Sequence, residues 1–236
     1  RFLLRRADAI VSCSRGLESE VTALEPRVKA HVIHNGIDAS RFVREGAASD
    51  QPAPPPEGER ILNIGKYEYR KAHDLLLRAF SSLLVERPTA HLVLVGETGP
   101  ELENTRRAVS EAHLEAHVTL HCGLPHAAIP GLLASARLFV LCSRWVPGKI
   151  GEGFPIAILE AGAMGTPVVA TRTCGADEII EDRVTGRLVP LEDREALTRA
   201  MREMLQDRAT AESMADNLAL RIREEFTWER AYQSYV

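Results

Sequence analysis

The stretch "GEGFPIAILEAGAMGTPVVA", residues 151–170, joins a glycine-flanked turn to a helical pattern and then to a short apolar run. We expect Pro155 at the first position of the helix, where its missing N–H group has no intrahelical partner to lose. The run "PVVAT" (167–171) has the β-branched, apolar composition of a buried strand. Two acidic residues, Glu152 and Glu160, lie eight positions apart in this otherwise apolar segment. Both carboxylates therefore need an explanation.

The same alternation of apolar run and helical pattern continues along most of the chain. Apolar runs of strand length lie at 60–65, 91–96, 117–123, 138–143, 167–171 and 186–190. A helix or helical turn follows each; after the first run, apolar residues recur at helical spacing at Leu75, Leu76, Ala79, Phe80 and Leu83. Parallel strands need such crossovers. The sequence therefore predicts an α/β fold, a doubly wound parallel six-stranded Rossmann-like sheet, with ligands beyond the carboxyl ends of the strands.

The regions outside this pattern predict the domain organisation. Residues 1–43 contain one strand–helix unit and a further strand, which cannot bury both faces alone, so we assign them to the remnant of another domain. Residues 44–59 hold four prolines, at 52, 54, 55 and 56, and should form a semi-rigid connector. The ligand-binding Rossmann-like domain would span 60–223. Residues 224–236 would form a C-terminal crossover helix with an aromatic stripe of Trp228, Tyr232 and Tyr235.

Composition and charge exclude several classes of function. The formal net charge is −4 and the pI about 6.1, so no basic field is available to hold a nucleic acid. The four cysteines form no C-x-x-C pair, which favours free thiols in a reducing cytosol. The apolar runs are shorter than the roughly 20 residues of a membrane span. We therefore expect a cytoplasmic protein, and peripheral association at the inner membrane face stays open.

The turn before the predicted helix has the properties of an anion site. The N–H groups of Gly153, Phe154 and Ile156 lack intrahelical partners, and the helix dipole adds positive potential. Glu152 beside such a site makes sense only if the ligand also carries hydroxyl groups whose hydrogen bonds the carboxylate can accept. A phosphorylated sugar carries both kinds of group.

Glu160 lies about two turns into the predicted helix, between Leu159 and Ala161, so its carboxylate should be at least partly buried. Burying a charge without partners is unfavourable. A surface glutamate paired with a cation is the simpler alternative, but position 164, one turn further on, is Met. A diol ligand or a backbone partner is therefore the favoured interpretation.

Two lysines follow the first strand of the predicted sheet. In "GKYEYRK" (65–71), Lys66 comes at the end of the strand and Lys71 where a helix begins, on the same sheet edge as residues 152–160. Fixed cations there would stabilise the charge that develops on a diphosphate leaving group. Two solvated lysines are the alternative. The sequence contains no D-x-D motif, so we expect no metal site, with the lysines in its place.

These segments together resemble a known family. "EGFPIAILEAGAMGTPVVAT", followed by "G..EII.D..TGRLVP", resembles the E-x7-E signature and following strands of retaining GT-B glycosyltransferases of the group 1, or family 4, type. "VIHNGID" and "GKYEYRKAHDLLLRAF" resemble their linker strand and first donor-domain loop. The similarity runs from about Ala7 to the last residue. It implies two Rossmann-like domains facing across a cleft, with this chain as the C-terminal donor domain plus the end of the N-terminal acceptor domain.

The resemblance also implies roles for individual residues. Glu160 would bind the ribose hydroxyls of a nucleotide-sugar donor, and Glu152 would bind the hydroxyls of its sugar. Lys66 and Lys71 would grip the diphosphate, so they form the catalytic group with Glu152. The base would lie against residues 122–124, and the backbone N–H groups of residues 153 and 154 would contact sugar and phosphate. The predicted donor contacts other than Glu160 are Gly65, Cys122, Gly123, Leu124, Ser143, Gly153, Phe154 and Pro155.

Three departures from the family pattern stand out: Lys66 replaces the usual Arg, Ala72 replaces the usual Gly, and "RWVPGKIG" (144–151) lengthens the loop before Glu152. The expected function is metal-independent, retaining transfer of a hexose from a UDP- or GDP-linked donor to a glycan, lipid-linked or small-molecule acceptor, with no further cofactor. The alternatives are a fragment that binds nucleotide-sugar without turnover, a nucleotide-sugar epimerase, and a pyridoxal-phosphate phosphorylase. With the acceptor domain largely missing, we expect the isolated fragment to be inactive.

Overall fold

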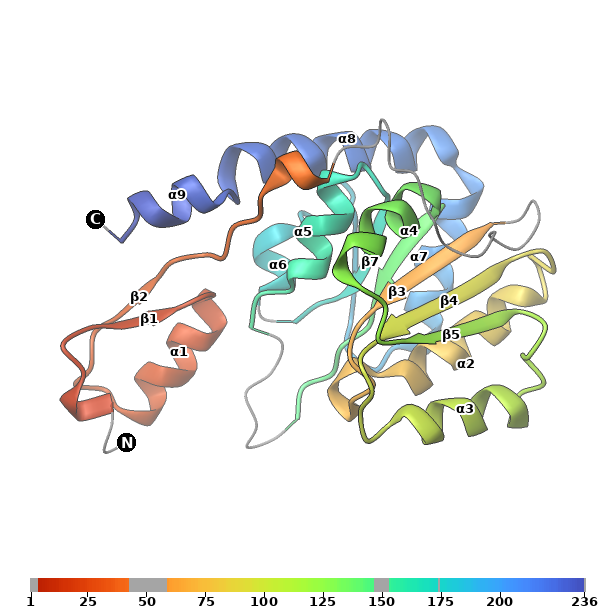
Figure 1. The fold of residues 1–236 in the computed structure, drawn as a ribbon, viewed down its shortest axis with the longest axis horizontal. Coiled ribbons are helices and arrows are strands. Elements are labelled where there is room, and N and C mark those ends of the chain that lie inside the picture. The colour runs from red at the N-terminus through yellow and green to blue at the C-terminus, as the bar shows by residue number, and fades with distance from the viewer. Residues whose placement is uncertain (1–3, 43–58, 147–152, 174, 236) are drawn as a thin grey trace.

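A parallel six-stranded sheet dominates the computed structural model, which describes residues 4–42, 59–146, 153–173 and 175–235 (Figure 1). The strands lie in the order β5-β4-β3-β6-β7-β8, and every neighbouring pair is parallel. Their bounds are β3 Arg60–Ile64, β4 His91–Gly96, β5 Val118–Cys122, β6 Leu138–Leu141, β7 Val168–Thr171 and β8 Arg187–Val189. The chain winds outward from β3 to β5, crosses back, and winds the other way from β6 to β8. The predicted doubly wound α/β fold is confirmed, with its switch point between β3 and β6.

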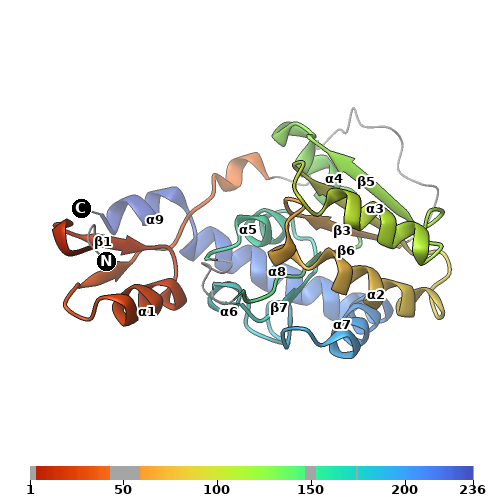
Figure 2. The same ribbon diagram turned by 90° about the horizontal axis from the view of Figure 1, so that it is seen from below.

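Helices cover both faces of this sheet (Figures 1 and 2). The apolar cluster on one face includes side chains of α2 His73–Leu84, α3 Leu102–Glu111 and α7 Arg194–Gln206. The cluster on the other includes side chains of α4 Ile129–Ser135, α5 Ile156–Ala163, α6 Ala176–Ile179 and α8 Arg208–Glu225. Along β7, Val169 belongs to the first cluster, and Val168 and Ala170 belong to the second. Because both faces are covered, β6 and β7 are buried at every position.

The amphipathic pattern of α2 places its predicted apolar face in the core. Thr198 of α7 donates a hydrogen bond from its hydroxyl to the carbonyl oxygen of Ala79 at 3.2 Å, which fixes α7 across α2. Burial of a large apolar side chain contributes about 1.5–3 kcal/mol, so this face anchors the helix that follows the loop at 65–71. None of its predicted core residues exposes more than 1% of its surface: Leu75, Leu76, Ala79, Phe80 and Leu83.

A smaller unit stands beside the sheet domain and contains β1 Ile10–Ser12, α1 Arg15–Leu24 and β2 Ala30–Val32 (Figure 1). β1 and β2 form a parallel two-stranded sheet, in line with the predicted strand, helix and strand. Short 3₁₀ turns, η1 Leu4–Arg6 and η2 Ala39–Arg41, flank it. Ser14 caps α1 by accepting a hydrogen bond from the N–H of Leu17 at 3.3 Å. No residue of α1 is fully buried, so this unit has little core of its own.

The tail of the chain crosses the linker that follows the small unit. The N–H of Ile37 donates to the carbonyl oxygen of Phe226 at 3.0 Å. A Cβ added at Gly36 would lie 2.2 Å from the carbonyl carbon of Thr227, so the two segments touch backbone to backbone. α9 Trp228–Gln233 then lies near the small unit (Figures 1 and 2). The predicted aromatic stripe is largely exposed along α9 and beyond it, at 53%, 70% and 64% for Trp228, Tyr232 and Tyr235.

Helix α5 begins later than the sequence predicts. Pro155 is its N-cap, with an extended backbone (φ −77°, ψ 98°), and Ile156 is its first residue. The prediction of Pro155 at the first helical position is therefore wrong by one residue, because its ψ keeps it outside the helix. Glu160 lies just over one turn into α5 rather than two. The predicted residue Glu152 and nearly all of the predicted connector lie outside the described residues.

Within the described ranges, no helix is long and apolar enough to cross a bilayer. Three cysteines, Cys13, Cys122 and Cys142, are free thiols, and the fourth, at position 174, lies outside the description.

Candidate functional site

Glycines bring the ends of three neighbouring strands together at the carboxyl edge of the sheet. The N–H of Gly123 donates to the carbonyl oxygen of Gly96 at 3.0 Å. A Cβ added at Gly96 would lie 2.2 Å from the carbonyl oxygen of Gly65, so only glycine permits this approach. Cys122 and Gly123 are exposed, and Leu124 packs partly buried against the core. The edge predicted to face the base is therefore exposed, and its glycines place no side chains over it.

The loop after β3 carries both predicted lysines to this edge. The exposed Lys66 has its Nζ 3.3 Å from Oε1 of Glu68, and Nε of Arg70 donates to Oε2 of the same carboxylate at 2.9 Å. The hydrogen bond from Arg70 is the largest of the effects that lower the pKa of Glu68. The stem of Lys71 packs over Gly65, whose added Cβ would lie 3.3 Å from Cδ of the lysine. The structure thus brings Gly65, Lys66 and Lys71 together.

Ala72 follows the 3₁₀ turn η3 Tyr69–Lys71 and adopts a left-handed backbone, with φ 46° and ψ 40°. It is also buried, exposing 1% of its surface. L-residues disfavour this conformation, whereas glycine adopts it freely. The conformation gives a physical reason for the glycine usual at this position in the resembling family. Ala72 both ends η3 and caps α2, so it sets the angle between the turn that carries Lys71 and the helix.

Arg144, which the sequence did not single out, joins the loop after β6 to the loop after β3. It exposes 5% of its surface, and its N–H donates to the carbonyl oxygen of Arg70 at 2.9 Å. Its guanidinium lies 4.4 Å from the centre of the Tyr69 ring. Nη2 donates to Oδ1 of Asp74 at 2.8 Å, and Nε donates to Oε1 of Glu192 at 2.8 Å. This buried cation therefore anchors the lysine-bearing loop from behind.

Glu160 is buried, as expected, and has a partner that the sequence did not predict. Its side chain is 9% exposed, and its Oε1 lies 2.8 Å from Nε2 of His126. Burial raises the pKa of Glu160, and the hydrogen bond to His126 and the charge of Arg41 oppose that rise. His126 opens the 3₁₀ turn η4 His126–Ala128 after β5. Its place in "CGLPHA", at the carboxyl end of a strand, was the only sequence signal for this contact.

The other predicted donor contacts differ in exposure. Phe154 and Pro155 are buried, and the Phe154 ring stacks on His34 with centroids 4.9 Å apart. Ser143 exposes 1% of its surface. Its N–H donates to Oγ1 of Thr171 at 2.8 Å, and its carbonyl accepts from the same hydroxyl at 2.8 Å. The side chain of Phe154 thus serves the core, which leaves its backbone as the part that could contact a ligand.

The small unit touches the start of α5 directly. A Cβ added at Gly153 would lie 2.6 Å from Cδ1 of Leu17, a side chain of α1. Nε2 of His34 lies 2.7 Å from Oε2 of Glu178, and the N–H of Arg15 donates to Oε1 of Glu178 at 2.8 Å. Glu178 lies on α6, and its carboxylate ties the small unit to the sheet domain close to Gly153, whose carbonyl oxygen touches Gly175 just before α6.

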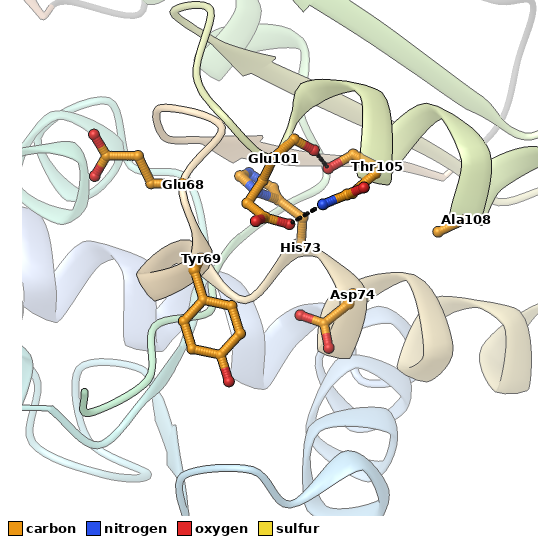
Figure 3. Close-up of a pocket in the computed structure, with 8 residues that line it drawn as sticks. Glu68, Tyr69, His73, Asp74, Glu101, Thr105 and Ala108 are labelled. Carbon is orange, nitrogen blue, oxygen red and sulfur yellow. Dashed lines mark hydrogen bonds between the residues drawn. The ribbon is translucent and has the colours of Figure 1, made fainter. Parts of the chain in front are cut away.

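A small hollow, bordered mostly by residues of polar type, lies between the 65–71 loop, α2 and α3 (Figure 3). His73 borders it, exposes 3% of its surface, and has no hydrogen-bond partner for either ring nitrogen among the described residues. Burial lowers the pKa of His73 to about 4, so the ring is neutral at pH 7. The residues around the hollow are Glu68, Tyr69, His73, Asp74, Glu101, Asn104, Thr105 and Ala108. None of them is a predicted donor contact.

A second hollow, of about 380 Å³, belongs to the small unit. It is bordered by β1, by α1, by the segment after β2 and by Tyr235 of the tail. Its lining is mainly apolar, with Val11, Leu17, Val21, Leu24 and Ile33. None of the predicted donor contacts lines it.

Comparison with known proteins gives one family. The model described as "Glycosyl transferases group 1" matches residues 46–221. The GDP-mannose-dependent alpha-(1-6)-phosphatidylinositol monomannoside mannosyltransferase of Mycolicibacterium smegmatis is 33% identical over 91% of this chain and 58% of its own length. Glycogen synthase of Mycobacterium tuberculosis is 29% identical over 97% of this chain and 53% of its own length. Sucrose-phosphate synthase from Thermosynechococcus elongatus superposes with a TM-score of 0.87 at 27% identity, over 99% of this chain and 58% of that one.

The chain thus spans between 53% and 58% of the length of these relatives. The family match covers the six-stranded sheet, the glycine edge, both lysines and Glu160. It confirms the resemblance to group 1 glycosyltransferases found in the sequence. The chain belongs to the glycosyl transferases group 1 family.

Proposed function

We propose that this chain is the donor-binding part of a retaining glycosyltransferase. It would move a hexose from a nucleoside-diphosphate sugar to a glycan, lipid-linked or small-molecule acceptor, without a metal ion. The observation that carries the proposal is that Gly65, Lys66, Lys71 and Glu160 lie on the carboxyl side of one parallel sheet, in a chain of this family. Open α/β sheets bind their ligands on that side.

The two lysines supply the charge that the reaction needs. When the bond between the anomeric carbon and the diphosphate breaks, its electron pair stays on the phosphate oxygen. Lys66 and Lys71 stabilise that developing charge, because both are held at the strand end before the ligand arrives. Lys66 is paired with Glu68 in this structure, so a diphosphate exchanges one anionic partner of this lysine for another. Arg144 holds the loop in place during that exchange.

The carboxylates recognise the hydroxyl groups of the donor. Glu160 would accept hydrogen bonds from the ribose, since its carboxylate is buried beside the open edge at residues 122–124. Glu152, which precedes α5, would accept from the sugar hydroxyls. The N–H groups of Gly153 and Phe154 would contact sugar and phosphate at the start of the helix. The M. smegmatis relative is a GDP-mannose-dependent mannosyltransferase, which supports a nucleoside-diphosphate hexose, UDP- or GDP-linked, as the donor.

A thermal-shift panel of UDP-, GDP- and ADP-sugars tests the donor class. A ligand present at 100 times its dissociation constant stabilises the folded state by about 2.7 kcal/mol, so a true donor raises the melting temperature measurably. We expect a shift with a UDP- or GDP-sugar and none with the corresponding nucleoside at equal concentration. A panel without any shift would contradict the proposal. Absorbance of bound pyridoxal in the purified protein would point to a phosphorylase instead.

Binding without transfer is the expected behaviour of residues 1–236 alone. The small unit offers one helix and two short strands beside Gly153, and the chain spans little more than half the length of its relatives. We therefore place the groups that position the acceptor outside this sequence. Incubation with the donor found in the panel and candidate acceptors, followed by mass spectrometry, checks this. A transferred hexose would show that residues 1–236 already contain the acceptor site.

A further inference from the structure

The contact between His126 and Glu160 joins an exposed side chain to a buried one. Nε2 of His126 lies 2.8 Å from Oε1 of Glu160, and the two side chains are 56% and 9% exposed. An ionised carboxylate only accepts hydrogen bonds, so the Nε2 of His126 carries the hydrogen. Within the described part of the chain, no hydrogen bond reaches the second oxygen, Oε2. One oxygen is therefore held while the other stays available.

We propose that His126 is a positioning residue that orients the carboxylate of Glu160 toward the ribose of the donor. By holding Oε1, it leaves Oε2 to accept a hydrogen bond from a ribose hydroxyl. The inference rests on the proposed function, because it takes a nucleotide as the ligand of Glu160. It adds a residue of the β5–α4 connection to a site whose acid lies on α5.

The position of His126 is fixed from several directions. Pro125 precedes it with φ −63° and starts the short turn η4, and the N–H of Ala128 closes that turn on the carbonyl oxygen of Pro125 at 2.9 Å. The buried ring of Phe42 meets the imidazole edge to face, with centroids 6.2 Å apart. The imidazole is therefore set by its own turn and by the linker segment, and does not depend on Glu160 alone.

The electrostatics of the pair agree with this role. Burial alone favours the protonated form of Glu160, which would donate rather than only accept hydrogen bonds. The hydrogen bond from His126 favours the ionised form, and Arg41, which precedes Phe42, adds to that preference. Without His126, the carboxyl group loses both its orientation and the main group that keeps it charged.

Ribose selectivity is the property that separates positioning from a purely structural role. A carboxylate oriented toward a ribose hydroxyl binds a ribonucleotide more tightly than its 2′-deoxy analogue, because the deoxy ligand leaves a buried acceptor unpaired. A fault in folding would weaken both ligands equally. The measurement is therefore the ratio of dissociation constants for GDP and 2′-deoxy-GDP, with UDP and 2′-deoxy-UDP as a second pair, by titration calorimetry.

We expect the wild type to prefer ribose by about tenfold, which corresponds to one hydrogen bond to a charged group. His126→Leu should bring the ratio close to one, as Glu160→Gln should. His126→Gln places an amide N–H near the position of Nε2 and should keep most of the preference. Since position 126 is exposed, all His126 variants should remain folded, which circular dichroism checks before the titrations.

The outcomes distinguish this inference from the proposed function. Unchanged ribose preference in His126→Leu, or a stronger preference, would overturn the positioning role while nucleotide binding stands. Equal loss of ribose preference in His126→Leu and His126→Gln would also overturn it, because the N–H donor at position 126 would then not be the cause of the preference. Failure of the wild type to bind any of the four nucleotides would overturn the proposed function, and the inference would fall with it.

Discussion

Nη2 of Arg144 lies 2.8 Å from Oδ1 and 3.1 Å from Oδ2 of Asp74, so a cation from the loop after β6 is fixed to the first turn of α2. The arginine side chain is 6% exposed, whereas the aspartate side chain is 46% exposed. The arginine charge therefore matters most for stability, because its buried guanidinium cannot replace its carboxylate partners with water.

Arg144→Met should lower the free energy of unfolding by about 1–3 kcal/mol, less than for a fully buried pair because both acidic partners retain solvent. Urea denaturation measures the change. Arg78→Met is the matched control, since Arg78 contacts the same aspartate at 3.1 Å from an exposed position. Its expected effect is about 0.5 kcal/mol or less. Equal effects of the two substitutions would show that burial of Arg144 adds nothing.

Ala72 should tolerate glycine and reject a β-branched residue. Its left-handed backbone costs an alanine about 1–2 kcal/mol, and a valine more. Ala72→Gly relieves this strain but loses a buried methyl group and gains unfolded-state entropy, so we expect a net change within about 1 kcal/mol. Ala72→Val should destabilise by about 2 kcal/mol or more. Chemical denaturation of both variants checks the difference, and a valine variant as stable as the glycine variant would contradict the backbone conformation.

His73 should make stability fall in mildly acidic solution. Burial lowers the pKa of His73 to about 4 in the folded state, below its ordinary value of 6.5. The neutral His73 therefore contributes its full share to the free energy of unfolding above pH 6.5. That share, about 3 kcal/mol in total, is lost as the pH falls toward 4.

The test is the pH dependence of unfolding between pH 7 and 4.5. His73→Gln should flatten this slope, because the titrating ring is gone. His31→Gln, at an exposed position of β2, is the control and should keep the wild-type slope. A slope that persists in His73→Gln would assign the acid sensitivity to other groups.

Lys71 should contribute to the affinity for a nucleoside diphosphate and not to the affinity for the nucleoside. If its ammonium group contacts phosphate oxygens, Lys71→Ala weakens binding of GDP or UDP by about 10- to 100-fold and leaves guanosine or uridine unchanged. Lys29→Ala, at an exposed position before β2, should change neither affinity. Calorimetry with and without EDTA completes the test. A chelator-sensitive affinity would mean that a metal ion, and not the lysine alone, holds the diphosphate.

Substitutions of the two glutamates should affect the affinities for nucleotide and nucleotide-sugar differently. Glu160→Ala should weaken GDP and GDP-mannose by the same factor, about tenfold, because the ribose is common to both. Glu152→Ala should weaken GDP-mannose more than GDP, since its proposed partner is the sugar. The same comparison applies to UDP and UDP-glucose. If both variants weaken both ligands equally, the division of roles between the two carboxylates is wrong.

The sheet was predictable because its strands carry their own signal. Each strand is a short apolar run followed by a helical pattern, and a parallel pair requires that crossover, so the parallel sheet and its ligand-binding edge follow from local sequence. The buried face of α2 was predictable for the same reason. The prediction for Pro155 was wrong by one residue. The fixed φ of proline suits both the N-cap and the first helical position, and only ψ decides between them.

The contacts that complete the site were not predictable in this way. Glu160 and His126 are separated by 34 positions, and His34 and Glu178 by 144, so each pair depends on the order of strands and on the path of loops. Arg144 resembles a solvated loop residue in the sequence. Its burial arises only when the β3 and β6 loops become neighbours at the switch point.

The crossing of Gly36 with Thr227 closes the chain into a loop, because it brings segments near its two ends into backbone contact. Ile37 pairs with Thr227 as an isolated bridge, and the glycine leaves no room between the backbones. Segments from opposite ends of the sequence are therefore joined backbone to backbone at this bridge. A cut after Phe226 would separate the segment that places Tyr235 against the hollow of the small unit, while all six strands of the sheet stay intact.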